Sequence, residues 1–407
     1  MRILLITQWF EPEFTLKGML LARELQRCGH EVEVLTGFPN YPGGVVYDGY
    51  RIKPFQREVI DGISIIRVAL YPSHDRSPFR RGLNYISFAL SAAFWGAILT
   101  RPADVMYVYH PPGTIGFTAW MLHLFKRIPF IYDIQDFWPE TLKSTGMLDS
   151  ELILGLIDRF CRISYSLAKH IVVLSPGFKD LLLKRGVDES KISVVYNWAD
   201  ERYLYPKKPT LPTDEESLLD GKFNIVFAGN LGRAQGLHCV LDAAERFMAF
   251  PNNVQFLFVG SGVEEQSLKQ SVYARGLTNV CFLPRRPVAH ITDILSSADV
   301  LLIHIKDDPL FEITVPSKTQ AYMAVGKPIL MVCKGDAREL IERAHCGLCC
   351  DPGNVDQLVE CVHTFSGMSD SERERLGLNG RRFYEEELSL KVGVQRTLDV
   401  LNRVSLQ

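Results

Sequence analysis

Short apolar runs alternate with longer amphipathic stretches along the first half of the chain. The run RILLIT at residues 2–7 is followed by a stretch with helical spacing and then by the run EVEVLTG at residues 31–37. Further apolar runs follow in the same manner: DVMYVYH, PFIYDIQD and HIVVLSPG. Apolar strands that alternate with helices are typical of a parallel sheet covered by helices on both faces. The pattern therefore predicts a doubly wound α/β domain.

The alternation stops near residue 200 and then begins again. Residues 201–222 contain three prolines, many charges and few apolar side chains, which is typical of a linker. After it come the runs FNIVFAGNLG, VQFLFVGSG, DVLLIHI and GKPILMV. A chain of 407 residues is also long enough for two cores. We predict a first domain at 1–200, a linker at 201–222, a second domain at 223–388, and a C-terminal helix at 389–407 that could cross back to the first domain.

Polar residues and glycines gather where the predicted strands end. His110 follows one strand of the first half, and Gly229, Asn230, Gly260 and Gly262 follow two strands of the second half. In an open parallel sheet, ligands bind beyond the carboxyl ends of the strands. We therefore expect two Rossmann-like domains that face each other across a cleft lined by these loops.

One predicted helix has a lysine in its first turn. In the stretch VPSKTQAYMAVGKPIL, Pro316 and Ser317 begin a helix and Lys318 lies in its first turn. A helix N-terminus offers unpaired backbone N–H groups and partial positive charge, which suit a phosphate group. Lys318 is therefore a candidate phosphate ligand; the alternative is a solvated charge at the start of a buried helix.

Composition and charge limit the classes of function. The net charge of −2 gives no indication of nucleic-acid binding, and 47% hydrophobic with 23% charged residues is typical of a soluble globular protein. Nine cysteines, and a first segment that we interpret as a strand, favour a reducing cytosol. Cys346, Cys349 and Cys350 suggest a metal or redox site, but no second close pair completes a zinc set. We interpret this segment as a strand that enters a turn.

The segment between Arg81 and Arg101 contains no charged residue and is apolar nearly all round. Our first interpretation is a helix packed against a sheet. The alternative is contact with a membrane, because Arg80 and Arg81 before the segment and Arg101 after it would suit a helix lying on an anionic lipid surface.

Familiar nucleotide-binding motifs are missing from the sequence. A dinucleotide fold needs three glycines at the first turn, whereas only Gly18 follows the first predicted strand, well downstream. A P-loop would need a glycine and a Ser or Thr where this chain has Ala321 and Pro328. Two sheets with loops suited to phosphate, but without either motif, favour sugar-nucleotide chemistry.

The chain resembles the retaining glycosyltransferases of family 4, which have the GT-B fold and include bacterial O-antigen, colanic-acid and capsule transferases, and within these an N-acetylfucosamine-type transferase. Segments along nearly the whole chain carry the resemblance: FEPEFTLKG, YHPPGTIG, DIQDFWPE, FAGNLGRAQGL, VGSGVEEQSL and VPSKTQAYMAVGKPIL. It implies that the second domain binds a nucleoside-diphosphate sugar and that the first binds the acceptor.

The resemblance also implies a set of donor-binding residues. These are Lys17, Gly18, Gly229, Asn230, Arg233, Gln235, Gly260, Gly262, Ser317, Lys318 and Gln320. Relatives have an Arg and a Lys where this chain has Asn230 and Gln235, so the positive charge would come from Arg233 and Lys318. Relatives also have two glutamates seven residues apart; Glu312 matches the first only if the loop shifts by one residue, and Gln320 stands where the second is missing.

On the acceptor side, the resemblance implies catalytic roles for His110, Asp136 and Glu312, and acceptor binding by Trp138 and Glu140. A carboxylate beside an aromatic ring is a common arrangement for a sugar. The alternative for Asp136 is an N-cap at the start of a helix.

The implied reaction is transfer, with retention, of an N-acetylated amino sugar from a UDP donor to a polyprenyl-diphosphate-linked saccharide. It would need no cofactor and no metal, and the sequence lacks the Asp-x-Asp pair of metal-using transferases. The enzyme would be cytoplasmic and peripheral on the inner face of the membrane, held through Arg80, Arg81 and the apolar helix. Two alternatives stay open: a sugar-nucleotide epimerase of the same architecture, and a subunit that binds a sugar nucleotide without catalysis.

Overall fold

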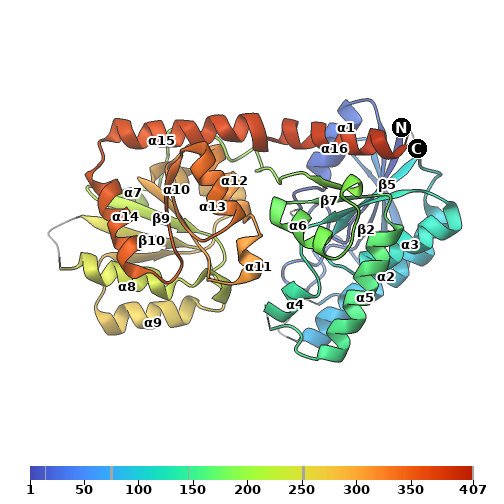
Figure 1. Ribbon diagram of the computed structural model, residues 1–407, viewed down its shortest axis with the longest axis horizontal. Helices are drawn as coiled ribbons and strands as arrows, with labels where there is room; N and C mark the ends of the chain where they lie inside the picture. Colours follow the sequence, from blue (N-terminus) through green and yellow to red (C-terminus); the bar gives the residue numbers. More distant parts are fainter. Residues whose placement is uncertain (14, 74–76, 145, 250–252, 406–407) are drawn as a thin grey trace. The chain divides into compact units, whose positions relative to one another are not determined.

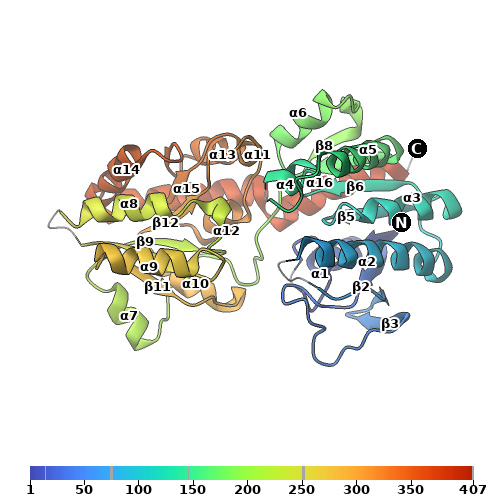
Figure 2. The same ribbon diagram turned by 90° about the horizontal axis from the view of Figure 1, so that it is seen from below.

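The computed structural model describes residues 1–407 except 14, 74–76, 145, 250–252 and 406–407. The chain divides into two compact units, one of Met1–Tyr196 together with Gly393–Gln407 and one of Asn197–Val392. Each unit has its own sheet with helices on both faces (Figures 1 and 2). The predicted fold class, two doubly wound α/β domains, is confirmed.

The sheet of the first unit has eight strands in the order β3-β4-β2-β1-β5-β6-β7-β8. Only the pair β3–β4 is antiparallel. The strands are β1 (Arg2–Ile6), β2 (Glu31–Gly37), β3 (Phe55–Ile60), β4 (Ile63–Val68), β5 (Val105–His110), β6 (Phe130–Ile134), β7 (His170–Val173) and β8 (Ile192–Val194). The helices are α1 (Met19–Arg27), α2 (Pro78–Leu99), α3 (Ile115–Lys126), α4 (Glu140–Ser144), α5 (Glu151–Leu167), α6 (Pro176–Lys184) and, from the end of the chain, α16 (Leu390–Ser405).

The sheet of the second unit is entirely parallel, in the order β11-β10-β9-β12-β13-β14. Its strands are β9 (Phe223–Ala228), β10 (Val254–Val259), β11 (Val280–Leu283), β12 (Val300–His304), β13 (Ile329–Val332) and β14 (Gly347–Cys350). Its helices are α7 (Thr213–Leu219), α8 (His238–Phe247), α9 (Glu265–Arg275), α10 (Val288–Ser297), α11 (Pro309–Glu312), α12 (Ser317–Val325), α13 (Asp336–Ala344), α14 (Val355–Gly367) and α15 (Asp370–Phe383).

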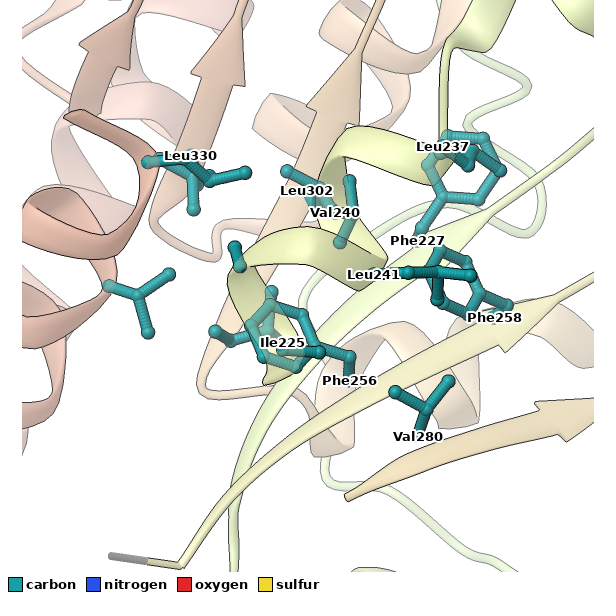
Figure 3. Packing of buried hydrophobic residues seen from close by; sticks show 14 of the residues in the cluster. Ile225, Phe227, Leu237, Val240, Leu241, Phe256, Phe258, Val280, Leu302 and Leu330 are labelled. Atoms are coloured by element: carbon teal, nitrogen blue, oxygen red, sulfur yellow. The ribbon is translucent and has the colours of Figure 1, made fainter. Parts of the chain in front are cut away.

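The apolar runs form the cores. Ile225, Phe227, Phe256 and Phe258 from β9 and β10 pack against helix α8, as Figure 3 shows for part of the cluster. Strand β5 is buried along its whole length, because helices cover both faces of the sheet. The strand order reverses between β1 and β5 in the first unit and between β9 and β12 in the second. Such switch points are where open α/β sheets bind ligands, beyond the carboxyl ends of the strands.

Helix α2 has two different apolar faces. Phe88, Ala92 and Gly96 are buried, and a Cβ on Gly96 would lie 2.8 Å from Leu35 of the sheet. The other face exposes an apolar stripe: Phe79, Leu83, Ile86, Leu90, Phe94 and Ile98. By length and composition alone α2 could cross a membrane. The buried face supports the interpretation as a helix packed against the sheet. The exposed stripe is an apolar surface that nothing in the described residues covers.

Candidate active site

Loops after β9 and β10 pack against each other so closely that they require glycine. The φ angle of Gly260 is +150°, and a Cβ there would lie 1.9 Å from the carbonyl oxygen of Gly229. A Cβ on Gly262 would lie 2.3 Å from the carbonyl oxygen of Leu231. Packing between two backbones therefore explains the glycines at these predicted ligand positions.

Lys318 crosses the end of β9. It lies in the first turn of α12, its Nζ is 4.7 Å from the ring centre of Phe227, and a Cβ on Gly229 would lie 2.6 Å from its Cε. Burial lowers the pKa of Lys318 to about 8. In the part of the chain that the structure describes, no carboxylate pairs with it. A desolvated ammonium without a counter-ion, beside free N–H groups of a helix, is suited to receive an anion.

Gln235 and Asn230 lie in the segment that follows β9. The Gln235 side chain accepts a hydrogen bond from the Gly232 N–H at 3.1 Å, and the Gln235 carbonyl accepts one from Nδ1 of His304 at 2.6 Å. Both contacts hold the loop itself, and the first occupies the side-chain oxygen of Gln235. Asn230 is exposed.

Arg233 is a surface residue, with a side chain that is 83% exposed and lies 3.6 Å from Glu264. Ser317 is also exposed. Gln320 is enclosed in α12 with 1% exposure, and its Oε1 has no hydrogen-bond partner among the described residues. The contact of Gln320 with a ribose stays a prediction.

Glu312 ends the short helix α11. A Cβ on Gly335 would lie 1.9 Å from the Glu312 carbonyl oxygen, so the loop after β13 packs directly on the loop after β12. The Glu312 carboxylate contributes to the raised pKa of Lys334, although the hydrogen bond from Lys334 to Asp307 contributes most. Glu312 is thus at the carboxyl edge of the same sheet as Lys318.

His110 is the last residue of β5 and is buried. Its ring meets Tyr132 and Trp138 edge-on, with centroid distances of 5.8 and 5.9 Å. Burial lowers the pKa of His110 to about 3, so the imidazole is neutral at physiological pH. Its Nδ1 has no hydrogen-bond partner among the described residues. A Cβ on Gly113 would lie 2.9 Å from the Trp138 ring, so this glycine lets the ring lie beside the histidine.

Asp136 lies in the loop after β6 and is partly buried. Burial raises the pKa of Asp136 to about 6. Its charge acts on the nearby hydroxyls of Tyr85 and Tyr109. Tyr85, from α2, also lies 6.3 Å from the Trp138 ring. The structure therefore brings the predicted His110, Asp136 and Trp138 together, with a carboxyl group whose pKa is raised to about 6.

Lys17 and Glu140, predicted for the donor and acceptor sites, both have ion-pair partners within the protein. Lys17 is completely buried in an ion pair with Asp133, at 2.6 Å, so it holds the first unit together and does not face a diphosphate. Gly18 precedes α1, and a Cβ there would lie 3.1 Å from the Cβ of Thr15, which is a tight contact. Glu140 forms an ion pair with Arg185, whose guanidinium lies 4.6 Å from the Phe137 ring. One oxygen of its carboxylate is thus engaged, whereas Oε2 is buried without a hydrogen-bond partner among the described residues.

Sequence reasoning missed Glu13, which is completely buried in the loop after β1. Its carboxyl oxygens accept hydrogen bonds from the N–H groups of Asn40, at 2.5 Å, Tyr41, at 2.6 Å, and Phe10, at 3.2 Å. These bonds tie the loop after β1 to the loop after β2. Tyr85 was missed as well, and nothing in its sequence context distinguishes it from the apolar residues around it.

The described residues contain no group of three or more His, Cys, Asp or Glu side chains that could hold a metal ion. Cys349 and Cys350 lie in strand β14, and the cysteines described in the structure are free thiols.

Comparison with known proteins extends over both units. Residues 19–198 match the family described as Glycosyl transferase 4-like domain, and residues 213–383 match Glycosyl transferases group 1. The colanic acid biosynthesis glycosyl transferase WcaI of Escherichia coli K12 is 25% identical over 380 residues, which cover 88% of this chain and 90% of WcaI. The glycosyltransferase WbjE of Pseudomonas aeruginosa is 26% identical over 304 residues, 72% of this chain and 73% of WbjE.

Among solved structures, HepE of Anabaena in complex with UDP and glucose superimposes with a TM-score of 0.70 and 16% identity, covering 98% of this chain and 99% of HepE. A likeness at this identity shows the shared GT-B fold.

Proposed function

Since the chain belongs to the group 1 glycosyltransferases of the GT-B fold, we propose that it transfers an N-acetylated amino sugar from a UDP donor to a lipid-linked saccharide, with retention at the anomeric carbon. The product would be a surface polysaccharide, in line with the names of WcaI and of the capsular polysaccharide glycosyltransferase CapM of Staphylococcus aureus. The UDP in HepE supports the donor base. The observation that carries the proposal is the uncompensated ammonium of Lys318 at the start of α12.

In this proposal the donor diphosphate lies against Lys318 and the first N–H groups of α12. Negative charge develops on the diphosphate as the bond to the sugar breaks. A fixed cation and aligned N–H groups in a site of low dielectric stabilise that charge without reorganisation. They would also supply the charge that a metal ion supplies in other transferases, so we expect turnover to persist in a chelator.

The acceptor would bind on the first unit. The Trp138 ring offers an apolar face to a sugar, and the neutral imidazole of His110 lies edge-on to that ring. Asp136, with a pKa of about 6, is ionised at neutral pH and can orient the attacking hydroxyl. The hydroxyl attacks from the side on which the diphosphate leaves, and its proton passes to the departing phosphate.

We also propose that the enzyme is peripheral on the cytoplasmic face of the membrane. The exposed stripe of α2 would enter the lipid interface, and each basic residue near an anionic surface adds about 1 kcal/mol. Flotation with anionic liposomes should carry the protein upward at low salt and lose it at high salt. Leu90→Glu, in the stripe, should weaken flotation, whereas Leu378→Glu, which is equally well exposed on α15, should not. Equal behaviour of the two variants would reject the lipid contact.

The deciding experiment incubates the protein with a panel of nucleoside-diphosphate sugars, with and without a lipid-linked acceptor, in the presence of a chelator. A transferase forms a product only with acceptor, or slowly hydrolyses the donor. An epimerase alters the sugar without acceptor, and a subunit that only binds leaves every donor intact. Either of the last two outcomes overturns the proposed function.

A further inference from the structure

Arg81 lies on a different side of α2 from the apolar stripe. In a helix, residues at i+4, i+7 and i+11 share a face with residue i. Arg81 therefore shares its face with Tyr85, Phe88 and Ala92, and the last two are buried. The stripe through Leu83, Ile86 and Leu90 points elsewhere. Arg81 is thus directed toward the body of the first unit and away from the surface that would meet lipid.

The Arg81 side chain is partly buried, and one of its guanidinium nitrogens lacks a partner in the described part of the chain. Its Nε is buried and forms no hydrogen bond there. A buried donor without an acceptor costs about 1–3 kcal/mol, and more when the group is charged. The simplest explanation for an arginine in this position is a ligand whose oxygen atoms accept its hydrogen bonds.

The neighbours of Arg81 belong to the acceptor site. Burial raises the pKa of Tyr85, while the charges of Arg81 and Asp136 act on Tyr85 in opposite directions. Tyr85 is therefore close enough to both a cation and a carboxylate to be affected by each charge. Its ring is 6.3 Å from that of Trp138, and its carbonyl accepts a hydrogen bond from the Thr114 hydroxyl at 3.1 Å. Thr114 directly precedes α3, in the loop that follows His110.

We propose that Arg81 binds the diphosphate of the lipid-linked acceptor, which rests on the function proposed above. The planar guanidinium matches two phosphate oxygens at once, which an ammonium cannot do. Each part of such an acceptor has a counterpart on α2 or beside it: the exposed apolar stripe for the lipid, Arg81 for the diphosphate, and Trp138 with Asp136 for the sugar. Arg81 is then an acceptor ligand, and Arg80, the exposed neighbour, is the residue of the pair that faces the membrane.

The test compares Arg81→Met with the matched control Arg80→Met in the full chain. Binding of farnesyl diphosphate and of farnesol is measured by calorimetry in detergent, and liposome flotation is measured in parallel. We expect Arg81→Met to weaken farnesyl diphosphate binding about 10- to 100-fold, the usual range for a charge-assisted contact, and to leave farnesol binding and flotation unchanged. Arg80→Met should weaken flotation only. Arg81→Lys, which keeps the charge, should recover part of the affinity.

Two results would overturn the inference. If Arg81→Met reduces flotation as much as Arg80→Met and leaves farnesyl diphosphate binding intact, Arg81 contacts lipid headgroups instead. If Arg81→Lys and Arg81→Met both bind farnesyl diphosphate like the wild type, Arg81 is no phosphate ligand. Failure of the proposed function gives a different pattern: no donor is consumed with any acceptor, while farnesyl diphosphate binding still depends on Arg81.

Discussion

Replacing Lys318 by methionine removes the cation from the proposed donor site and keeps the length of the side chain. Lys318 forms no ion pair within the described chain, so its loss leaves no carboxylate unpaired. The charge-assisted contact to a diphosphate is worth about 1.5–3 kcal/mol, which corresponds to roughly a 10- to 100-fold increase in the Kd for UDP at pH 7. The melting temperature should not fall, because a desolvated charge is replaced by an apolar group in contact with Phe227.

The lowered pKa gives this prediction a pH dependence. With a pKa of about 8, Lys318 loses its proton as the pH rises, and an anionic ligand would restore it. The affinity of the wild type for UDP should therefore be constant below pH 7 and fall about tenfold per pH unit above 8. In the unfolded chain a lysine keeps a pKa near 10.4, so the unfolded state binds more protons between about pH 8 and 10. The free energy of unfolding should rise with pH across that window in the wild type and not in Lys318→Met.

Titration calorimetry with UDP measures the affinity of both proteins at about pH 6.5, 8 and 9.5, which lie below, at and above the pKa of Lys318. Denaturant unfolding at the same pH values measures their stability. Proton uptake on binding near pH 8.5, seen as a dependence of the heat on the buffer, is a third readout. If Lys318→Met binds UDP as tightly as the wild type at every pH, Lys318 is not a diphosphate ligand. A melting temperature that falls sharply would instead show that the lysine stabilises the fold.

Three further predictions concern other parts of the molecule. Asp136→Asn should lower kcat/KM about 10²- to 10⁴-fold and abolish the loss of activity that the wild type shows below its pKa of about 6; a pH profile that stays unchanged contradicts the role. Lys17→Met should destabilise the first unit by about 3–5 kcal/mol in urea unfolding, because Asp133 stays buried without its cation, and the double variant with Asp133→Asn should recover part of this. Gly260→Ala should cost more than about 1 kcal/mol and weaken UDP binding, since its Cβ would meet the Gly229 carbonyl; normal binding and stability would refute that packing.

The sequence alone determined the architecture and the local setting of several candidate site residues. Alternation of apolar runs with amphipathic stretches fixes which segments are buried strands, because only a sheet covered on both faces buries continuous apolar runs. Lys318 could be placed at a helix start from the local pattern of Pro316 and Gly326, since helix ends depend on neighbouring residues. His110 ends β5, and Asp136 and Trp138 follow β6; the proximity of these residues depends on the pairing of the two strands, which the structure supplied.

Only the tertiary structure decided which charged groups are free to act. Lys17 and Asp133 are 116 positions apart in the chain, and Glu140 and Arg185 are 45 apart, yet each pair is joined in the fold. Local sequence shows that a residue is charged, but its partner depends on long-range packing, which no short-range pattern encodes. The same holds for the direction of Arg81, whose neighbour Arg80 has the same charge and a different environment. Electrostatic stabilisation depends on the distance between charges and on their burial, and not on their order along the chain. Packing between distant segments therefore decides whether a charge is neutralised within the protein or left for a ligand.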